Sequence, residues 1–117
     1  MKIAITAWGN RVSPVFDAAR TLLIADIKGH TIKSKTYVSF HPDDIQDLAA
    51  LLSHEQVSTL ICGAISTEPS DQIAENHIRL ISFVSGNALD ILNSFASRYT
   101  IDQSHMMPGC SLDYSRR

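Results

Sequence analysis

The sequence lacks the features that mark most secreted, membrane-spanning and nucleic-acid-binding proteins. Its 117 residues include only 2 cysteines, too few for a secreted disulfide framework, so we expect a reducing, cytoplasmic environment. No apolar run approaches the roughly 20 residues that cross a membrane, and Gly9 interrupts the opening MKIAITAW too early for a signal peptide. A formal net charge of -2 gives no electrostatic basis for nucleic-acid binding. A single globular domain over residues 1–117 remains, and its hydrophobic content of 44% suffices for a core.

The hydrophobic pattern along the chain predicts an α/β fold. Strands are expected at 2–8, 21–27, 31–40, 58–62 and 78–83. Helices are expected to begin near Pro42, at Thr67 and after Asn87, where the residue types favour a helix start. Right-handed crossovers then place the five strands in the mixed order 3-2-1-4-5, with helices flanking the sheet and a tail from about residue 101. This arrangement is ribonuclease-H-like.

The strand order predicts a crevice where the first and fourth strands end. Connections leave these strands in opposite directions, and ligands favour such switch points. The loops expected there are WGNRVSPVFD at 8–17 and CGAIST at 62–67. Arg11 of the first loop could meet an anionic ligand, because a guanidinium suits oxyanions; an ordinary exposed charge is the alternative.

The two cysteines lie in different contexts. The segment MPGC at 107–110 fits a type II turn, in which backbone N–H groups approach the Cys110 sulfur and stabilise its thiolate. Cys62 ends a buried strand, where a free cysteine commonly packs as a small hydrophobe. It is followed by Gly63 and by a helix start that offers N–H groups to an anion. Both cysteines are therefore candidate metal ligands, with a purely structural role as the alternative for each.

Three stretches together resemble one protein family. RVSPVFDAA at 11–19, ICGAIS at 61–66 and MPGC at 107–110 are similar to the cysteine-bearing branch of the dinitrogenase iron-molybdenum cofactor biosynthesis domain family. The resemblance implies a ribonuclease-H-like domain that binds, carries or handles an iron-sulfur or molybdenum-containing cluster. It also implies a cluster donor or acceptor protein as partner. The expected cofactor-binding residues are Cys62, Cys110, Gly63, Arg11 and Ser13.

Two thiolates do not complete a four-ligand iron-sulfur site. Three completions stay open: a homodimer that pools four cysteines, imidazole from His105, or a cluster held by few covalent bonds. His105 is otherwise a solvated tail residue. A homodimer could form through the edge strand at 31–40, although Lys33 and Lys35 are charges of the kind that prevent edge pairing.

The sequence contains no catalytic constellation. The strand at 2–8 lacks the carboxylates with which a ribonuclease-H-type nuclease holds Mg²⁺, so we expect a binding protein and no enzyme. The alternative function is a thiol redox switch or a regulatory adaptor without bound metal.

Overall fold

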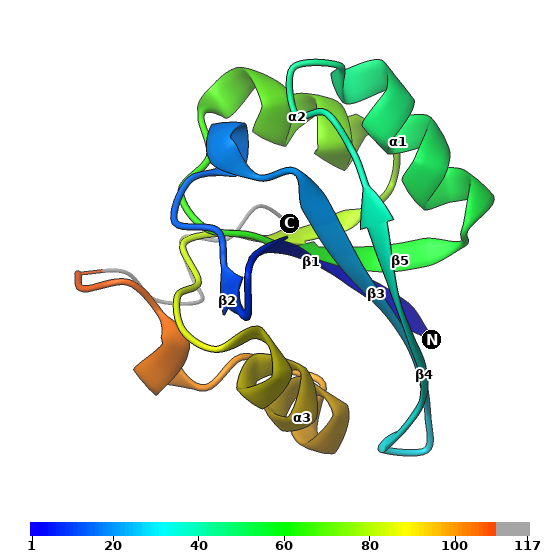
Figure 1. The fold of residues 1–117 in the computed structure, drawn as a ribbon, viewed down its shortest axis with the longest axis vertical. Helices are drawn as coiled ribbons and strands as arrows, with labels where there is room; N and C mark the ends of the chain where they lie inside the picture. The colour runs from blue at the N-terminus through cyan, green and yellow to red at the C-terminus, as the bar shows by residue number, and fades with distance from the viewer. Residues whose placement is uncertain (110–117) are drawn as a thin grey trace.

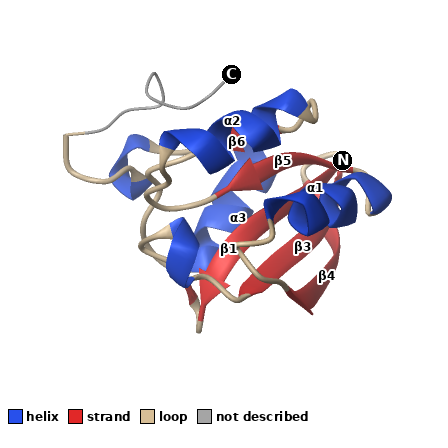
Figure 2. Ribbon diagram, turned by 90° about the horizontal axis from the view of Figure 1, so that it is seen from above, coloured by secondary structure: helices blue, strands red, loops and turns tan. Residues whose placement is uncertain are grey.

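The computed structural model describes residues 1–109 and shows a mixed α/β fold (Figure 1). The strands are β1 (Lys2–Trp8), β2 (Arg11–Val12), β3 (Thr21–Lys28), β4 (Thr31–Ser39), β5 (Val57–Ile61) and β6 (Arg79–Ile81). The helices are α1 (Ile45–His54), α2 (Thr67–Glu75) and α3 (Ala88–Arg98), with short 3-10 helices η1 (Phe16–Ala18) and η2 (Gln103–His105). Helices α1 and α2 cover one face of the sheet, and α3 covers the other (Figures 1 and 2).

The sheet follows the order β4-β3-β1-β5-β6, which confirms the predicted order of the five main strands. β1 pairs antiparallel with β3 and parallel with β5. The predicted count of five strands is wrong, because β2 pairs with β1 as a sixth strand. Gly9, with φ of 64°, helps to close the turn between them. A strand of two residues shows no alternation, so the hydrophobic pattern could not reveal it.

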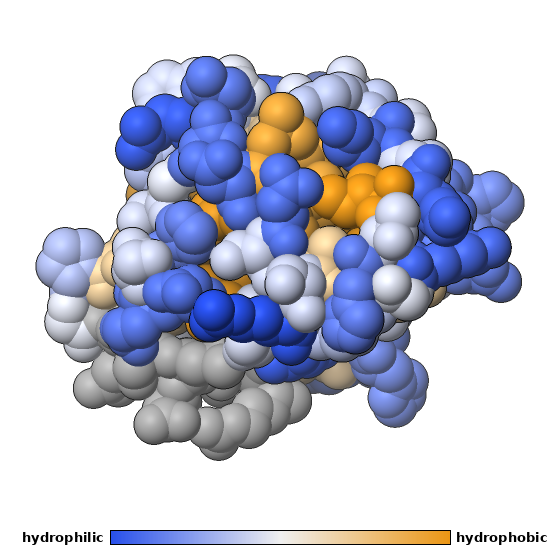
Figure 3. Space-filling model, turned by 90° about the horizontal axis from the view of Figure 1, so that it is seen from below, coloured by the Kyte–Doolittle hydropathy of each residue, from blue (hydrophilic) through white to orange (hydrophobic). Residues whose placement is uncertain are grey.

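The alternation of side chains along β1 divides the core into two layers. Ile3 and Ile5 pack with α3, whereas Ala4 packs with residues of α1 and α2. Phe95 fills the first layer and Phe16 the second, and both are fully buried. Burying each such large apolar side chain stabilises the fold by roughly 1.5–3 kcal/mol. Seen from below, the outer surface is mostly hydrophilic around one hydrophobic patch (Figure 3).

The helix starts follow from their capping residues. The Asp47 backbone N–H donates to the Asp44 carboxylate at 3.2 Å, so α1 begins at Ile45, after the proline that marked its predicted start. Asn87 caps α3 as predicted, since its side-chain oxygen accepts from the Asp90 backbone N–H at 3.0 Å. Within residues 1–109, no helix is both long enough and apolar enough to cross a membrane.

Candidate functional site

The loops that follow β2 and β5 are joined to each other by backbone hydrogen bonds. The Ala64 N–H donates to the Pro14 carbonyl at 2.9 Å, and the Phe16 N–H donates to the Ala64 carbonyl at 2.8 Å. Gly63 permits this close approach, because a Cβ at that position would collide with the carbonyl oxygens of Ser13 and Pro14. The expected crevice is therefore closed at Gly63, whose observed role is close backbone packing.

Cys62 is completely buried among apolar side chains of the layer beneath α1 and α2. Its Sγ donates a hydrogen bond to the Gly63 carbonyl at 3.4 Å. Burial raises the pKa of the Cys62 thiol to about 12. In this conformation the thiol is protonated at neutral pH and shielded from solvent. Metal ligation by Cys62 stays a prediction, and it requires both exposure and deprotonation.

The tail returns to the end of the sheet where β5 and β6 finish. The Ser85 N–H donates to the His105 carbonyl at 2.7 Å, and the Met107 N–H donates to the Phe83 carbonyl at 2.8 Å. Met106, which is 6% exposed, packs into the layer beneath α3 and anchors this segment. Cys110, the other predicted ligand, lies outside the described residues.

Four segments thus lie side by side, and we call them the loop edge: 13–16, 62–64, 82–85 and 105–107. Two hydrogen bonds join segment 82–85 to segment 62–64. The Phe83 N–H donates to the Gly63 carbonyl at 2.9 Å, and the Val84 N–H donates to the Cys62 carbonyl at 3.0 Å. The backbone of Cys62 is therefore one segment away from the tail. The side chains of Cys62 and Met106, however, belong to opposite layers of the core.

Ser13 and Arg11 are the predicted cofactor contacts of the first loop, and they differ in exposure to solvent. Ser13 is fully buried, and its hydroxyl donates to the Val15 carbonyl at 2.8 Å. Its observed role is to shape the loop. Arg11 is exposed in β2, where it lies opposite Trp8 and forms a backbone bridge to Asn87. A guanidinium on this surface is free to approach an anion from solvent.

His105 lies half-buried beside Gly86, and its Nδ1 atom is buried without a hydrogen-bond partner among the described residues. The η2 turn that positions it is capped by Asp102, which accepts from the Ser104 backbone N–H at 2.9 Å. This hydrogen bond lowers the pKa of Asp102. Asp102 also lies 3.7 Å from the Arg98 guanidinium. His105 is thus held at the loop edge with one ring nitrogen unused.

The described residues do not by themselves complete a metal site. Residues 1–109 contain no group of three or more His, Cys, Asp or Glu side chains that could hold a metal ion. A cavity of about 210 Å³ lies near the starts of α1 and α2, but Asp17, Asp43 and Glu68 line it. Carboxylates repel an anionic cluster, so this cavity does not suit one.

The predicted strand 78–83 extends too far, because β6 ends at Ile81 and residues 82–86 form a loop between Arg11 and the tail. Phe83 adopts φ of 63°, which is uncommon for a bulky residue, and its backbone joins Gly63 on one side to Met107 on the other. Gly86, with φ of 124°, accepts from the Val12 N–H at 2.9 Å. The Ser85-Gly86 pair is a turn signal that could have drawn attention to this loop.

Comparisons with known proteins agree with this architecture. The model of the family described as "Dinitrogenase iron-molybdenum cofactor" matches residues 1–98. The crystal structure of PH0822 has a TM-score of 0.76 and 20% identity, over 87% of this chain and 93% of that one. MJ0327 from Methanocaldococcus jannaschii has a TM-score of 0.67 and 22% identity, over 87% and 92%.

The apo form of the orange protein from Desulfovibrio gigas is also similar, with a TM-score of 0.65 and 15% identity over 86% of this chain and 90% of that one. No match is found among curated protein sequences. At these identities the structural likeness shows the fold alone, and the family rests on the match to its model.

Proposed function

This chain belongs to the dinitrogenase iron-molybdenum cofactor family, and from that premise we propose that it binds and carries a metal cluster. The family gives the chain a cofactor-related role. We propose as cargo an iron-sulfur or molybdenum-containing cluster, received from a donor protein or passed to an acceptor protein during cofactor assembly or handling. The ribonuclease-H-like class, the cytoplasmic location and the absence of enzymatic activity stay predictions beside this proposal.

The observation that carries the proposal is the docking of the tail at the loop edge. Met106 is buried and Met107 is hydrogen-bonded to Phe83, so the chain is fixed there three residues before Cys110. Met107 is thus held next to His105, at the end of the sheet where Arg11 is also found, and Cys110 follows it by three residues in the sequence.

The chemistry of these groups suits an anionic cluster. A Cys110 thiolate would supply the sulfur ligand that iron and molybdenum accept. The Nδ1 of His105, which is buried and has no hydrogen-bond partner among residues 1–109, would add a nitrogen once it is exposed. Arg11 offers positive charge, and Trp8, which is 64% exposed, offers an apolar surface. Two completions fit this donor set: a homodimer in which each copy supplies a thiolate, or a cluster held by few covalent bonds.

The redox-switch alternative has less support in this structure. A thiol switch needs a reactive thiolate, and the buried Cys62 thiol, with its pKa near 12, is a poor nucleophile at neutral pH. We therefore retain cluster binding as the proposed function.

Anaerobic NMR on ¹⁵N-labelled protein tests where the cargo binds. Iron, sulfide and thiomolybdate are added in turn, and amide shifts are recorded with a His105→Ala variant in parallel. We expect the largest changes at Ser85, His105 and Met107, with the α1 amides unchanged as internal reference. Changes that avoid the loop edge, or none at all, would contradict the proposal.

A further inference from the structure

β4 forms the edge of the sheet opposite β6. Among residues 1–109 no strand lies beyond β4, and residues 33–37 are all exposed. An edge strand presents unpaired backbone N–H and C=O groups to solvent, which form a template for another strand. This edge is separate from the loop edge, where β1, β5 and the tail meet.

A bulge limits the usable part of this template. Asp26 pairs with Ser34, and Ile27 pairs with Ile32, so Lys33 is an extra residue without a partner on β3. From Ser34 to Ser39 the pairing with β3 is regular. These six residues, which we call the β4 template, can accept a further strand without interruption.

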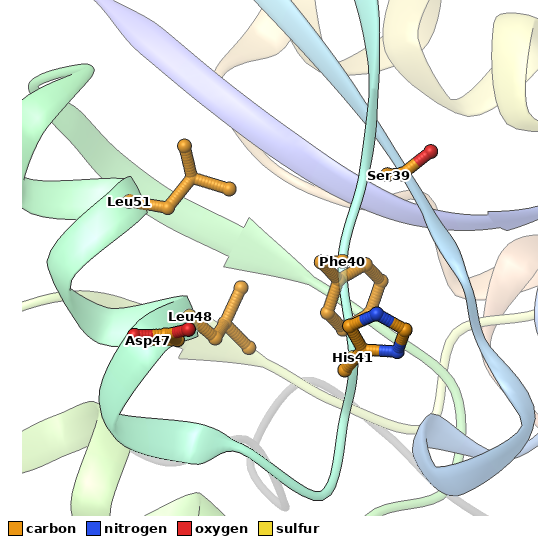
Figure 4. A pocket seen from close by; sticks show the side chains of 6 residues that line it. All are labelled: Ser39, Phe40, His41, Asp47, Leu48 and Leu51. Carbon is orange, nitrogen blue, oxygen red and sulfur yellow. The ribbon is translucent and has the colours of Figure 1, made fainter.

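A cavity of about 200 Å³ lies where the β4 template ends, between this part of the chain and α1. Leu48 and Leu51 extend from α1 toward the segment that carries Phe40 and His41 (Figure 4). Val38, which is partly buried, lies on the same face of the sheet. A side chain from an added strand can enter this cavity, and an apolar one suits its lining.

The charges on β4 select the kind of partner. β4 carries Lys33 and Lys35 and no acidic residue, and both lysines are exposed. A second copy of β4 offers these lysines no opposite charge, because β4 carries no acidic residue, and edge lysines disfavour pairing between identical edges. Lys35 favours a strand that carries a carboxylate at the opposite position.

From these features we infer that β4 binds an extended acidic segment of a partner protein by strand addition. The segment pairs antiparallel with the β4 template, places a carboxylate opposite Lys35 and inserts an apolar side chain into the cavity beside Leu48 and Leu51. The β4 template shares no residue with the loop edge, although the Phe40 ring that lines the cavity lies 6.0 Å from the Phe16 ring of the loop edge. The inference holds whether or not the chain carries a cluster.

The test uses two capped octapeptides of threonine and valine with a leucine at position 3. When the leucine pairs with Val38, position 6 of the peptide pairs with Lys35. One peptide has glutamate at position 6, and the other has lysine. Binding to the ¹⁵N-labelled full chain is followed by NMR at peptide concentrations up to about 1 mM, the range of weak binding. We expect amide shifts at residues 34–41 and 47–51, and about fivefold tighter binding of the glutamate peptide.

Variants separate strand addition from nonspecific attraction. Lys35→Glu is expected to reverse the preference between the two peptides, and the matched control Lys28→Glu, at an exposed site on β3, is expected to keep it. Leu51→Ser is expected to weaken both peptides alike. The inference is overturned if neither peptide shifts residues 34–41, if the charge preference survives Lys35→Glu, or if the chain alone dimerises through β4.

Discussion

Replacing Gly63 with alanine tests whether close backbone packing holds the loop edge together. The alanine Cβ would overlap the carbonyl oxygens of Ser13 and Pro14, so the two loops must separate. Separation breaks the hydrogen bonds from Ala64 N to Pro14 O and from Phe16 N to Ala64 O. Each contributes about 1 kcal/mol, and the displacement of the buried Phe16 ring adds a comparable amount. We expect the free energy of unfolding to fall by about 2–4 kcal/mol.

Urea and thermal unfolding measure this loss, which corresponds to a drop in Tm of roughly 10 °C for a domain of this size. Gly29→Ala is the matched control: Gly29 has φ of 55° and no atom within 4 Å of an added Cβ. That control should lose about 1 kcal/mol from backbone strain alone. If Gly63→Ala loses no more than Gly29→Ala, the packing explanation is refuted.

Three further predictions concern single side chains. The free energy of unfolding should fall as pH rises from about 9 to 12, because the unfolded chain releases the Cys62 thiol proton at a lower pH than the folded chain does. This fall should approach about 1.4 kcal/mol per pH unit, and it should be absent in Cys62→Ala. Met106→Ala should cost about 2–4 kcal/mol and speed hydrogen exchange at the Met107 amide, and unchanged exchange would argue against tail docking. Trp8→Ala should change stability by less than about 1 kcal/mol, since the side chain is 64% exposed, yet weaken cargo binding.

The main architecture could be predicted because strong periodic signals mark it. The strands now known as β1, β3, β4, β5 and β6 alternate or form short apolar runs, and crossover handedness then fixes their order. The chemistry of Asn87 alone predicts the cap that α3 has. For these strands and for the α3 cap, the local residue preferences agree with the final topology, so the sequence predicts them.

The loop edge could be predicted only in part, because nonlocal backbone contacts create it. Gly63 was expected to serve a ligand, but its lack of a side chain is used to pack against Ser13 and Pro14. Cys62 precedes a loop in the sequence, yet the register of β5 turns its side chain into the core. No local pattern shows that Phe83 accepts a hydrogen bond from the tail, since the partners are far apart in sequence.

The most direct test of cluster binding is anaerobic reconstitution with iron, sulfide and thiomolybdate, followed by metal content and visible absorption. Wild type is compared with Cys110→Ala and Cys62→Ala, both checked for folding by circular dichroism. We predict that Cys110→Ala loses most of the bound metal and the visible bands. If Cys110→Ala keeps the metal content and spectrum of wild type, the tail is not the metal-binding element; if wild type itself takes up no metal, the proposed function is wrong.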